Sequence, residues 1–169
     1  MNLFYSPGAC SLAPHIVLQE AGLAYTLEKV SLKTNTLEDG TPLKTITPKN
    51  YVLSLLLDSG EVLTEGPAIV QYLADLVPDK AIAPRNGSME RYRMQSWLTY
   101  IGTEIHKAFP PFFHDGGAQW KAEAKANLEK AFALVNEHLS DKDYLLGTQF
   151  SVADPYLFTV TRWAKVAQI

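Results

Sequence analysis

The chain has 169 residues, of which 47% are apolar and 20% are charged, and its formal net charge at neutral pH is −3. These values are ordinary for a globular protein that buries a core, and the length suits one large domain or two small ones. A net charge so close to zero gives no electrostatic reason to expect a nucleic acid partner. The four histidines and the single cysteine show no metal-ligand spacing, so no metal site is expected.

The cellular compartment is suggested by the cysteine count and by the start of the chain. One cysteine cannot form an internal disulfide, which favours a reducing compartment. The chain starts with a strand-like segment rather than a basic leader, and no apolar run approaches the length that spans a membrane. We therefore expect a cytoplasmic protein without a membrane partner.

The first 77 residues alternate strand-like and helical segments, which predicts a compact mixed-sheet domain at 1–77. Strands are predicted at 3–5, 26–30, 52–57 and 61–63, the last two joined by a hairpin turn. A helix is predicted after the first strand and ends at Gly22. A second helix is predicted at 65–77, with Thr64 as its cap and Pro67 in its first turn.

The second half of the chain has no strand-like alternation and predicts an all-helical domain at 88–169. It is separated from the first by a proline- and glycine-containing linker at 78–87. Helical spacing predicts long helices at 88–108, ended by two prolines, and at 119–139.

The last predicted helix opens with Ser151-Val-Ala-Asp154, which resembles a capping box with Asp in place of Glu. Pro155 is expected to cost this helix one backbone hydrogen bond. The helix is apolar on more than one face, and the sequence stops at Ile169 without further helices to cover it. We expect that nothing in this chain covers Val160 and Trp163. Either the chain is cut short, or another subunit covers that surface.

The single cysteine, Cys10, lies in Tyr5-Ser-Pro-Gly-Ala-Cys-Ser-Leu-Ala-Pro14, between a predicted strand and a predicted helix. A sulfur near the start of a helix is favoured as the thiolate, because the helix dipole is positive there. The alternative is that the lone cysteine is a small buried apolar residue, which is the commoner role of a free cysteine.

Four stretches of the chain carry a resemblance to a known family. They are Leu3-Phe-Tyr-Ser-Pro-Gly-Ala-Cys-Ser-Leu-Ala-Pro-His-Ile16, 63–66 with 68–75, 97–101 with 103–107, and 150–154 with 156–160. The chain resembles the glutathione transferases, and most of all their bacterial beta class. The resemblance runs from the first residue to the last in a single register. The resemblance implies a thioredoxin-like N-terminal domain, a helical C-terminal domain, a homodimer, and glutathione as a co-substrate without any other cofactor.

The resemblance also implies which residues act on the glutathione sulfur. Cys10 is expected beside this sulfur, with which it can form a mixed disulfide. Tyr5 is the second choice of donor to the glutathione thiolate. Ser11 is a third candidate, although helix capping is the simpler role for it. His106 is expected to border the pocket as a donor or base, and the alternative is an interdomain histidine with a purely structural role.

Two residues at the start of the 65–77 helix are expected to hold the amino end of glutathione. The resemblance pairs Glu65 with the α-ammonium, and the backbone N–H groups at Gly66 and its neighbours with the α-carboxylate, as helix N-termini do for anions. The alternative for Glu65 is that it complements the helix dipole without binding a ligand.

Three positions depart from the family pattern. Leu53 stands where the family has a cis proline after Val52, whose backbone pairs with the cysteinyl unit of glutathione. Because a cis bond before a non-proline residue costs about 2.5–4 kcal/mol, we predict a trans Val52–Leu53 bond and a displaced or disordered loop. Tyr51 replaces a Gln that reaches the γ-glutamyl group, and Asn35 replaces a Lys near the glycyl carboxylate. Weakened glutathione binding is the resulting hypothesis.

The leading hypothesis is a glutathione transferase that conjugates glutathione to a small apolar electrophile or exchanges disulfides with glutathione through Cys10. The alternative is a non-catalytic or weakly binding relative that serves as an interaction module, and a third possibility is a disulfide reductase acting through the same thiol. The identity of the electrophile does not follow from the sequence.

Overall fold

The computed structural model describes all 169 residues and divides the chain into two compact units, Met1–Lys80 and Ala81–Ile169. The division falls inside the segment 78–87 that the sequence marks as a linker. None of the helices in either unit has the length and apolar character needed to cross a bilayer.

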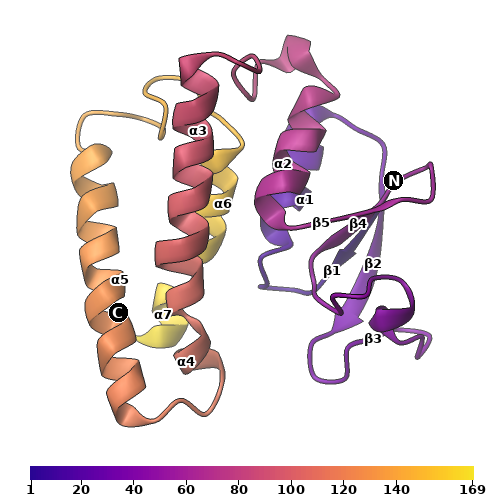
Figure 1. Cartoon of the computed structure of the whole chain (residues 1–169), viewed down its shortest axis with the longest axis horizontal. Coiled ribbons are helices and arrows are strands. Elements are labelled where there is room, and N and C mark those ends of the chain that lie inside the picture. The colour runs from indigo at the N-terminus through magenta and orange to yellow at the C-terminus, as the bar shows by residue number, and fades with distance from the viewer. The chain divides into compact units, whose positions relative to one another are not determined.

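The N-terminal unit is built on a five-stranded mixed sheet (Figure 1). Strand β1 (Asn2–Tyr5) lies at its centre, parallel to β2 (Thr26–Ser31) and antiparallel to β4 (Ser54–Leu56). The edges are β3 (Thr36–Leu37), which pairs with β2, and β5 (Val62–Thr64), which pairs with β4. The spatial order is therefore β3-β2-β1-β4-β5.

All four predicted strands are present, while β3 was not predicted. The largest difference is in the segment 52–57, where β4 begins two residues later than expected because residues 52 and 53 belong to a loop. β3 has only two residues, which is too short for an alternating pattern to reveal.

Helices α1 (Leu12–Ala21) and α2 (Gly66–Asp75) lie side by side against one face of the sheet (Figure 1). α1 ends as predicted at Gly22, which takes the left-handed conformation at φ 67° and returns its N–H to the last turn. The predicted cap of α2 is wrong, since Thr64 is the last residue of β5 and Glu65 precedes the helix.

The two faces of the sheet bury different side chains because strand residues alternate in direction. Leu3 is fully buried, and its side chain points to the opposite face from that of its neighbour Phe4. Phe4 belongs to a second cluster on the opposite face, with Val30, Leu37 and Leu43. Val52 packs against this second cluster, which places the loop before β4 on the sheet rather than in solvent.

The C-terminal unit begins with α3 (Met89–Tyr100), which Ser88 caps by accepting a hydrogen bond from the N–H of Arg91. The helix continues through a π-helical turn at Ile101–Ile105 and a 3₁₀ turn at His106–Ala108, so the predicted span of 88–108 is helical but its last turns are not α-helical.

The two prolines at 110 and 111 do not simply end the preceding helix. They open a further short helix, α4 (Pro110–Phe113), because proline fits the first turn of a helix. α5 (Ala118–His138) follows and runs beside the α3 helix in Figure 1.

The predicted contact of Asp154 with Ser151 is present at the start of α6 (Ala153–Thr161), although the residue before the helix is Val152, which makes no side-chain cap. One carboxylate oxygen accepts hydrogen bonds from the N–H and the hydroxyl of Ser151, at 2.7 and 2.9 Å, and the other accepts from the N–H of Leu145 at 2.8 Å. Pro155 was expected to cost a hydrogen bond, which is wrong. It is the third residue of α6, and N–H groups of the first turn have no helical partner in any case.

The expectation that α6 and the chain beyond it lack partners is also wrong for the two residues that carried it. Val160 is fully buried, and Trp163 is 9% exposed with its ring against Phe109 and Phe113, at centroid distances of 5.4 and 5.3 Å. The cause is that α6 turns its apolar side chains inward and continues into α7 (Ala164–Ala167). Phe158, at 53% exposed, remains on the outside.

Asp154→Ala should lower the free energy of unfolding by about 2 kcal/mol, because it removes three hydrogen bonds to a half-buried carboxylate at a helix start. Urea unfolding followed by circular dichroism measures the change. Asp141→Ala is the matched control, since Asp141 is 76% exposed and pairs with the neighbouring Lys142. The control should change stability by less than about 0.5 kcal/mol, and equal effects of the two substitutions would contradict the prediction.

Candidate functional site in the N-terminal unit

The loop between β1 and α1 places Cys10 next to the loop 46–53, which precedes β4. The Cys10 thiol donates a hydrogen bond to the carbonyl oxygen of Val52, with 3.7 Å between sulfur and oxygen. The two loops come from positions 42 residues apart in the sequence, and the sheet brings them together.

The protonation of Cys10 differs from the sequence expectation. Burial raises the pKa of the Cys10 thiol to about 11, and the negative charge of Glu65 adds to the increase, while backbone N–H groups of Cys10, Leu53 and Ser11 oppose it. The expected preference for the thiolate is therefore wrong for the free protein. α1 begins only at Leu12, and the loss of water around the sulfur outweighs the polar groups nearby.

The Val52–Leu53 peptide bond is cis, so the predicted trans bond is wrong. Val52 packs against the Phe4 cluster, so the loop is not displaced from the sheet. Side-chain contacts on each side of the bond accompany this conformation, with Val52 against the sheet. Leu53 is 6% exposed, and a Cβ added at Gly66 would lie 3.6 Å from its methyl group. The Ser54 hydroxyl donates a hydrogen bond to the Tyr51 carbonyl at 3.1 Å.

Glu65 and Gly66 form the start of α2 beside this loop. Glu65 adopts φ 72°, a conformation that is uncommon for a non-glycine residue, and its carbonyl accepts hydrogen bonds from the N–H groups of Ala68 and Ile69. Its carboxylate is 61% exposed and pairs with the Lys49 ammonium at 2.6 Å. The N–H of Gly66, as the first of the helix, has no acceptor within α2.

The structure thus brings together five residues that the sequence singled out, which are Cys10, Val52, Leu53, Glu65 and Gly66. Lys49 joins them and was missed, because a lysine in a loop carries no pattern that predicts its partner 16 residues away. The chemistry of this set is a neutral thiol, a carbonyl, a carboxylate and a helix start, which suits a ligand with a polar backbone and an ammonium group.

The remaining candidates of the N-terminal unit take part less directly. Tyr5 ends β1 and is half-buried. Ser11 is 1% exposed and its hydroxyl bonds both the N–H and the carbonyl of Ser6, so it is committed to the structure of its loop. Tyr51 is 66% exposed. Asn35 adopts φ 52° and its backbone bonds Ser31 and Leu43.

His106 belongs to the C-terminal unit, where aromatic side chains hold it. Its Nδ1 is 2.8 Å from the hydroxyl of Tyr156, and its ring lies 4.9 Å from that of Trp163, centroid to centroid. Tyr156 is 4% exposed. Its link to His106 was not predicted, since 50 residues separate the two.

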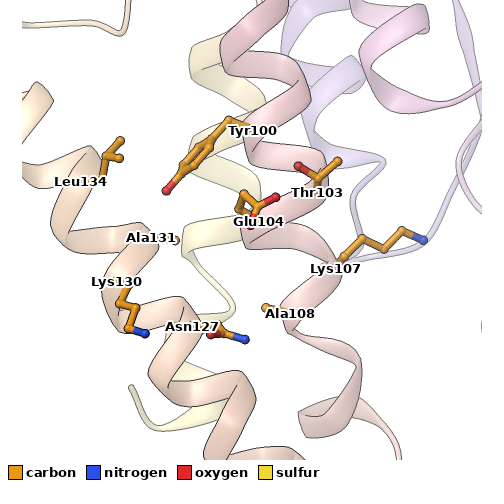
Figure 2. A pocket seen from close by; sticks show the side chains of 9 residues that line it. All are labelled: Tyr100, Thr103, Glu104, Lys107, Ala108, Asn127, Lys130, Ala131 and Leu134. Atoms are coloured by element: carbon orange, nitrogen blue, oxygen red, sulfur yellow. The ribbon is translucent and has the colours of Figure 1, made fainter.

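The C-terminal unit also contains a groove of about 440 Å³ between α5 and the helical turns that follow α3 (Figure 2). Its lining consists of Tyr100, Thr103, Glu104, Lys107, Ala108, Asn127, Lys130, Ala131 and Leu134. Burial, with the charge of Glu104, raises the pKa of Tyr100. The lining is mixed rather than apolar and contains no cysteine or histidine.

The chain belongs to the glutathione S-transferase family, since models of the N-terminal and C-terminal domains of glutathione S-transferases match residues 8–76 and 118–168. Glutathione S-transferase GstA of Escherichia coli O157:H7 is 48% identical over 170 residues, which cover 100% of this chain and 85% of that protein. Two solved structures each cover 100% of the chain, and the chain spans 85% of theirs. They are the bacterial beta class enzyme of Sphingomonas chungbukensis, at 46% identity and a TM-score of 0.96, and a sphingomonad glutathione S-transferase complexed with glutathione, at 44% and 0.95.

These findings confirm the family, the thioredoxin-like and helical parts of the fold, and the beta-class character of the chain. The chain is a glutathione transferase, an enzyme for which glutathione is a co-substrate rather than a cofactor. The comparisons give no support to the alternative of a non-catalytic interaction module.

The pKa of Cys10 predicts how the free protein reacts with iodoacetamide. Because the thiolate is the reactive form and the pKa is about 11, only about 1% of the thiol is ionised at pH 9. The alkylation rate should rise with pH beyond 10 without a plateau, and mass spectrometry of the single cysteine measures it. A plateau below pH 8 would show that the thiolate is stabilised instead.

Proposed function

We propose that the chain joins the sulfur of glutathione to a small apolar electrophile, with the tripeptide held in the N-terminal unit around Cys10, Val52 and Glu65. The observation that carries this proposal is the hydrogen bond from the Cys10 thiol to the Val52 carbonyl. It places a neutral S–H donor beside the backbone segment that the family resemblance pairs with the cysteinyl unit of glutathione.

The raised pKa supports a specific role for Cys10. A thiol that keeps its proton near neutral pH can donate a hydrogen bond to a bound thiolate, whereas a second thiolate would repel it. Cys10 therefore stabilises the glutathione thiolate, which then attacks the electrophile. Tyr5 is the second donor in this proposal, and His106, oriented by Tyr156, is a further donor or base.

Glutathione is anchored by backbone and side-chain groups of the same unit. The backbone of Val52 pairs with the cysteinyl unit, with Leu53 buried behind it. Glu65 receives the α-ammonium and the N–H of Gly66 receives the α-carboxylate. The exposure of the Glu65 carboxylate and the open first turn of α2 support these roles.

Asn35 and Tyr51 are the departures that still favour weakened binding. Asn35 provides no cation for the glycyl carboxylate, and a charge-assisted hydrogen bond of that kind is worth about 1.5–3 kcal/mol. Tyr51 keeps its ring in solvent. The loop itself gives no reason for weak binding, because Val52 packs against the sheet and Leu53 is buried.

Substitutions of Cys10 test the role of the thiol. With an aryl halide as the electrophile, Cys10→Ser should keep a substantial part of the conjugation rate, since a hydroxyl also donates, while Cys10→Ala should lower kcat about tenfold or more. Any glutathione-dependent disulfide exchange should disappear in both variants. Equal loss of conjugation in the two variants would favour a nucleophilic cysteine, and unchanged conjugation in Cys10→Ala would remove Cys10 from the mechanism.

We also propose that two copies of the chain form a homodimer. Large apolar side chains exposed on the helices of the C-terminal unit support this, among them Tyr92 on α3 at 57% and Leu134 on α5 at 47%. Sedimentation equilibrium should give twice the 18.7 kDa of one chain. A mass of one chain at micromolar concentration would exclude a stable dimer.

A further inference from the structure

Lys49 and Glu65 form an ion pair that the mechanism above does not use. The Lys49 ammonium lies 2.6 Å from Oε1 of Glu65, and the two side chains are 49% and 61% exposed. Exposed pairs of this kind contribute little to the stability of a fold, so the pair can open without disturbing the structure around it. Its location is therefore of more interest than its strength.

Glu65 lies at the start of α2, close enough to Cys10 for its charge to act on the thiol. The Glu65 backbone is fixed because its carbonyl closes the first turn of α2, through the N–H groups of Ala68 and Ile69. Lys49 approaches the carboxylate from the loop 46–53, the same loop whose Val52 carbonyl accepts the Cys10 hydrogen bond. One carboxylate thus faces both a protein ammonium group and the proposed site for a ligand ammonium group.

We infer that Lys49 is the counter-ion of Glu65 in the absence of glutathione, and that the α-ammonium of glutathione has to displace it. This inference rests on the proposed function, in which Glu65 receives that ammonium. Both cations are primary ammonium groups that bind the same carboxylate. They compete for it, so each lowers the affinity of the carboxylate for the other. Lys49 acts through Glu65 and is a positioning residue that limits affinity for the amino end of the ligand.

A second consequence can be measured without glutathione. The charge of Glu65 contributes to the raised pKa of Cys10, and Lys49 offsets part of that charge. Removal of the lysine should therefore raise the pKa of Cys10 further. Alkylation of the free protein at a fixed pH should become slower, by about twofold.

The experiment compares Lys49→Met with Lys49→Arg, which keeps the charge, and with Lys29→Met as the matched control. Lys29 pairs with Glu38 at 3.3 Å in the same unit, and these side chains are 48% and 73% exposed. Calorimetry of the full chain with glutathione should give Lys49→Met a dissociation constant about two- to fivefold lower than that of the wild type. High salt should reduce the difference, and both other variants should bind like the wild type.

An analogue of glutathione that lacks the α-amino group completes the test. It has no cation to compete with Lys49, so it should gain no affinity in Lys49→Met. Weaker glutathione binding by Lys49→Met, or an equal gain for the analogue, would overturn the inference.

Glu65→Gln separates the inference from the proposal on which it rests. If Glu65→Gln weakens glutathione binding while Lys49→Met does not strengthen it, only the role of Lys49 fails. If Glu65→Gln leaves glutathione binding unchanged, Glu65 does not receive the ammonium, and the inference about Lys49 is overturned together with that part of the proposed function.

Discussion

The burial of the loop 46–53 against the sheet is the constraint on which the N-terminal unit depends. Val52 packs on the Phe4 cluster, and Leu53 fills the space beside Gly66. Leu53 is buried and Val52 is partly buried against the sheet, and these contacts place the Val52 carbonyl within reach of the Cys10 thiol. Positioning of the site is thus a consequence of apolar packing on the two sides of one peptide unit.

The same burial determines the chemistry of the thiol. The Cys10 thiol bonds to the Val52 carbonyl, and desolvation of its sulfur by burial is the largest cause of its raised pKa. A sulfur whose charged form is disfavoured by desolvation does not readily become a second anion beside the glutathione thiolate. The geometry therefore favours a cysteine that donates a hydrogen bond over one that attacks as a nucleophile. The negative charge of Glu65 adds to the rise in the pKa of Cys10, and the positive charge of Lys49 offsets part of that effect.

The fold could be predicted from the sequence wherever a local signal was strong. Gly22, Ser88 and Asp154 mark helix ends through backbone conformation and capping, which depend on a few neighbouring residues. The two-residue β3 and the π-helical turn at Ile101–Ile105 carry no such signal. For the site, Cys10 was singled out by its position before a helix and by the family resemblance, and Glu65 by the resemblance. The cis Val52–Leu53 bond and the Lys49 contact depend on tertiary packing. The intrinsic free energy of the Val52–Leu53 bond favours the trans isomer, and the local sequence does not reveal the distant residues that bury Leu53.

The position of the loop at Leu53 determines what the three departures from the family pattern imply for function. A displaced loop would have removed the Val52 backbone from the site and would have argued for a protein that keeps the fold without the activity. The loop is in place with leucine at this position, so the departures that remain, Asn35 and Tyr51, affect side chains at the half-exposed or exposed edge of the unit. Side chains at such an edge alter how tightly a ligand is held and not how its sulfur is oriented. The difference between this chain and its relatives is therefore expected in the binding of glutathione, and not in the chemistry that follows it.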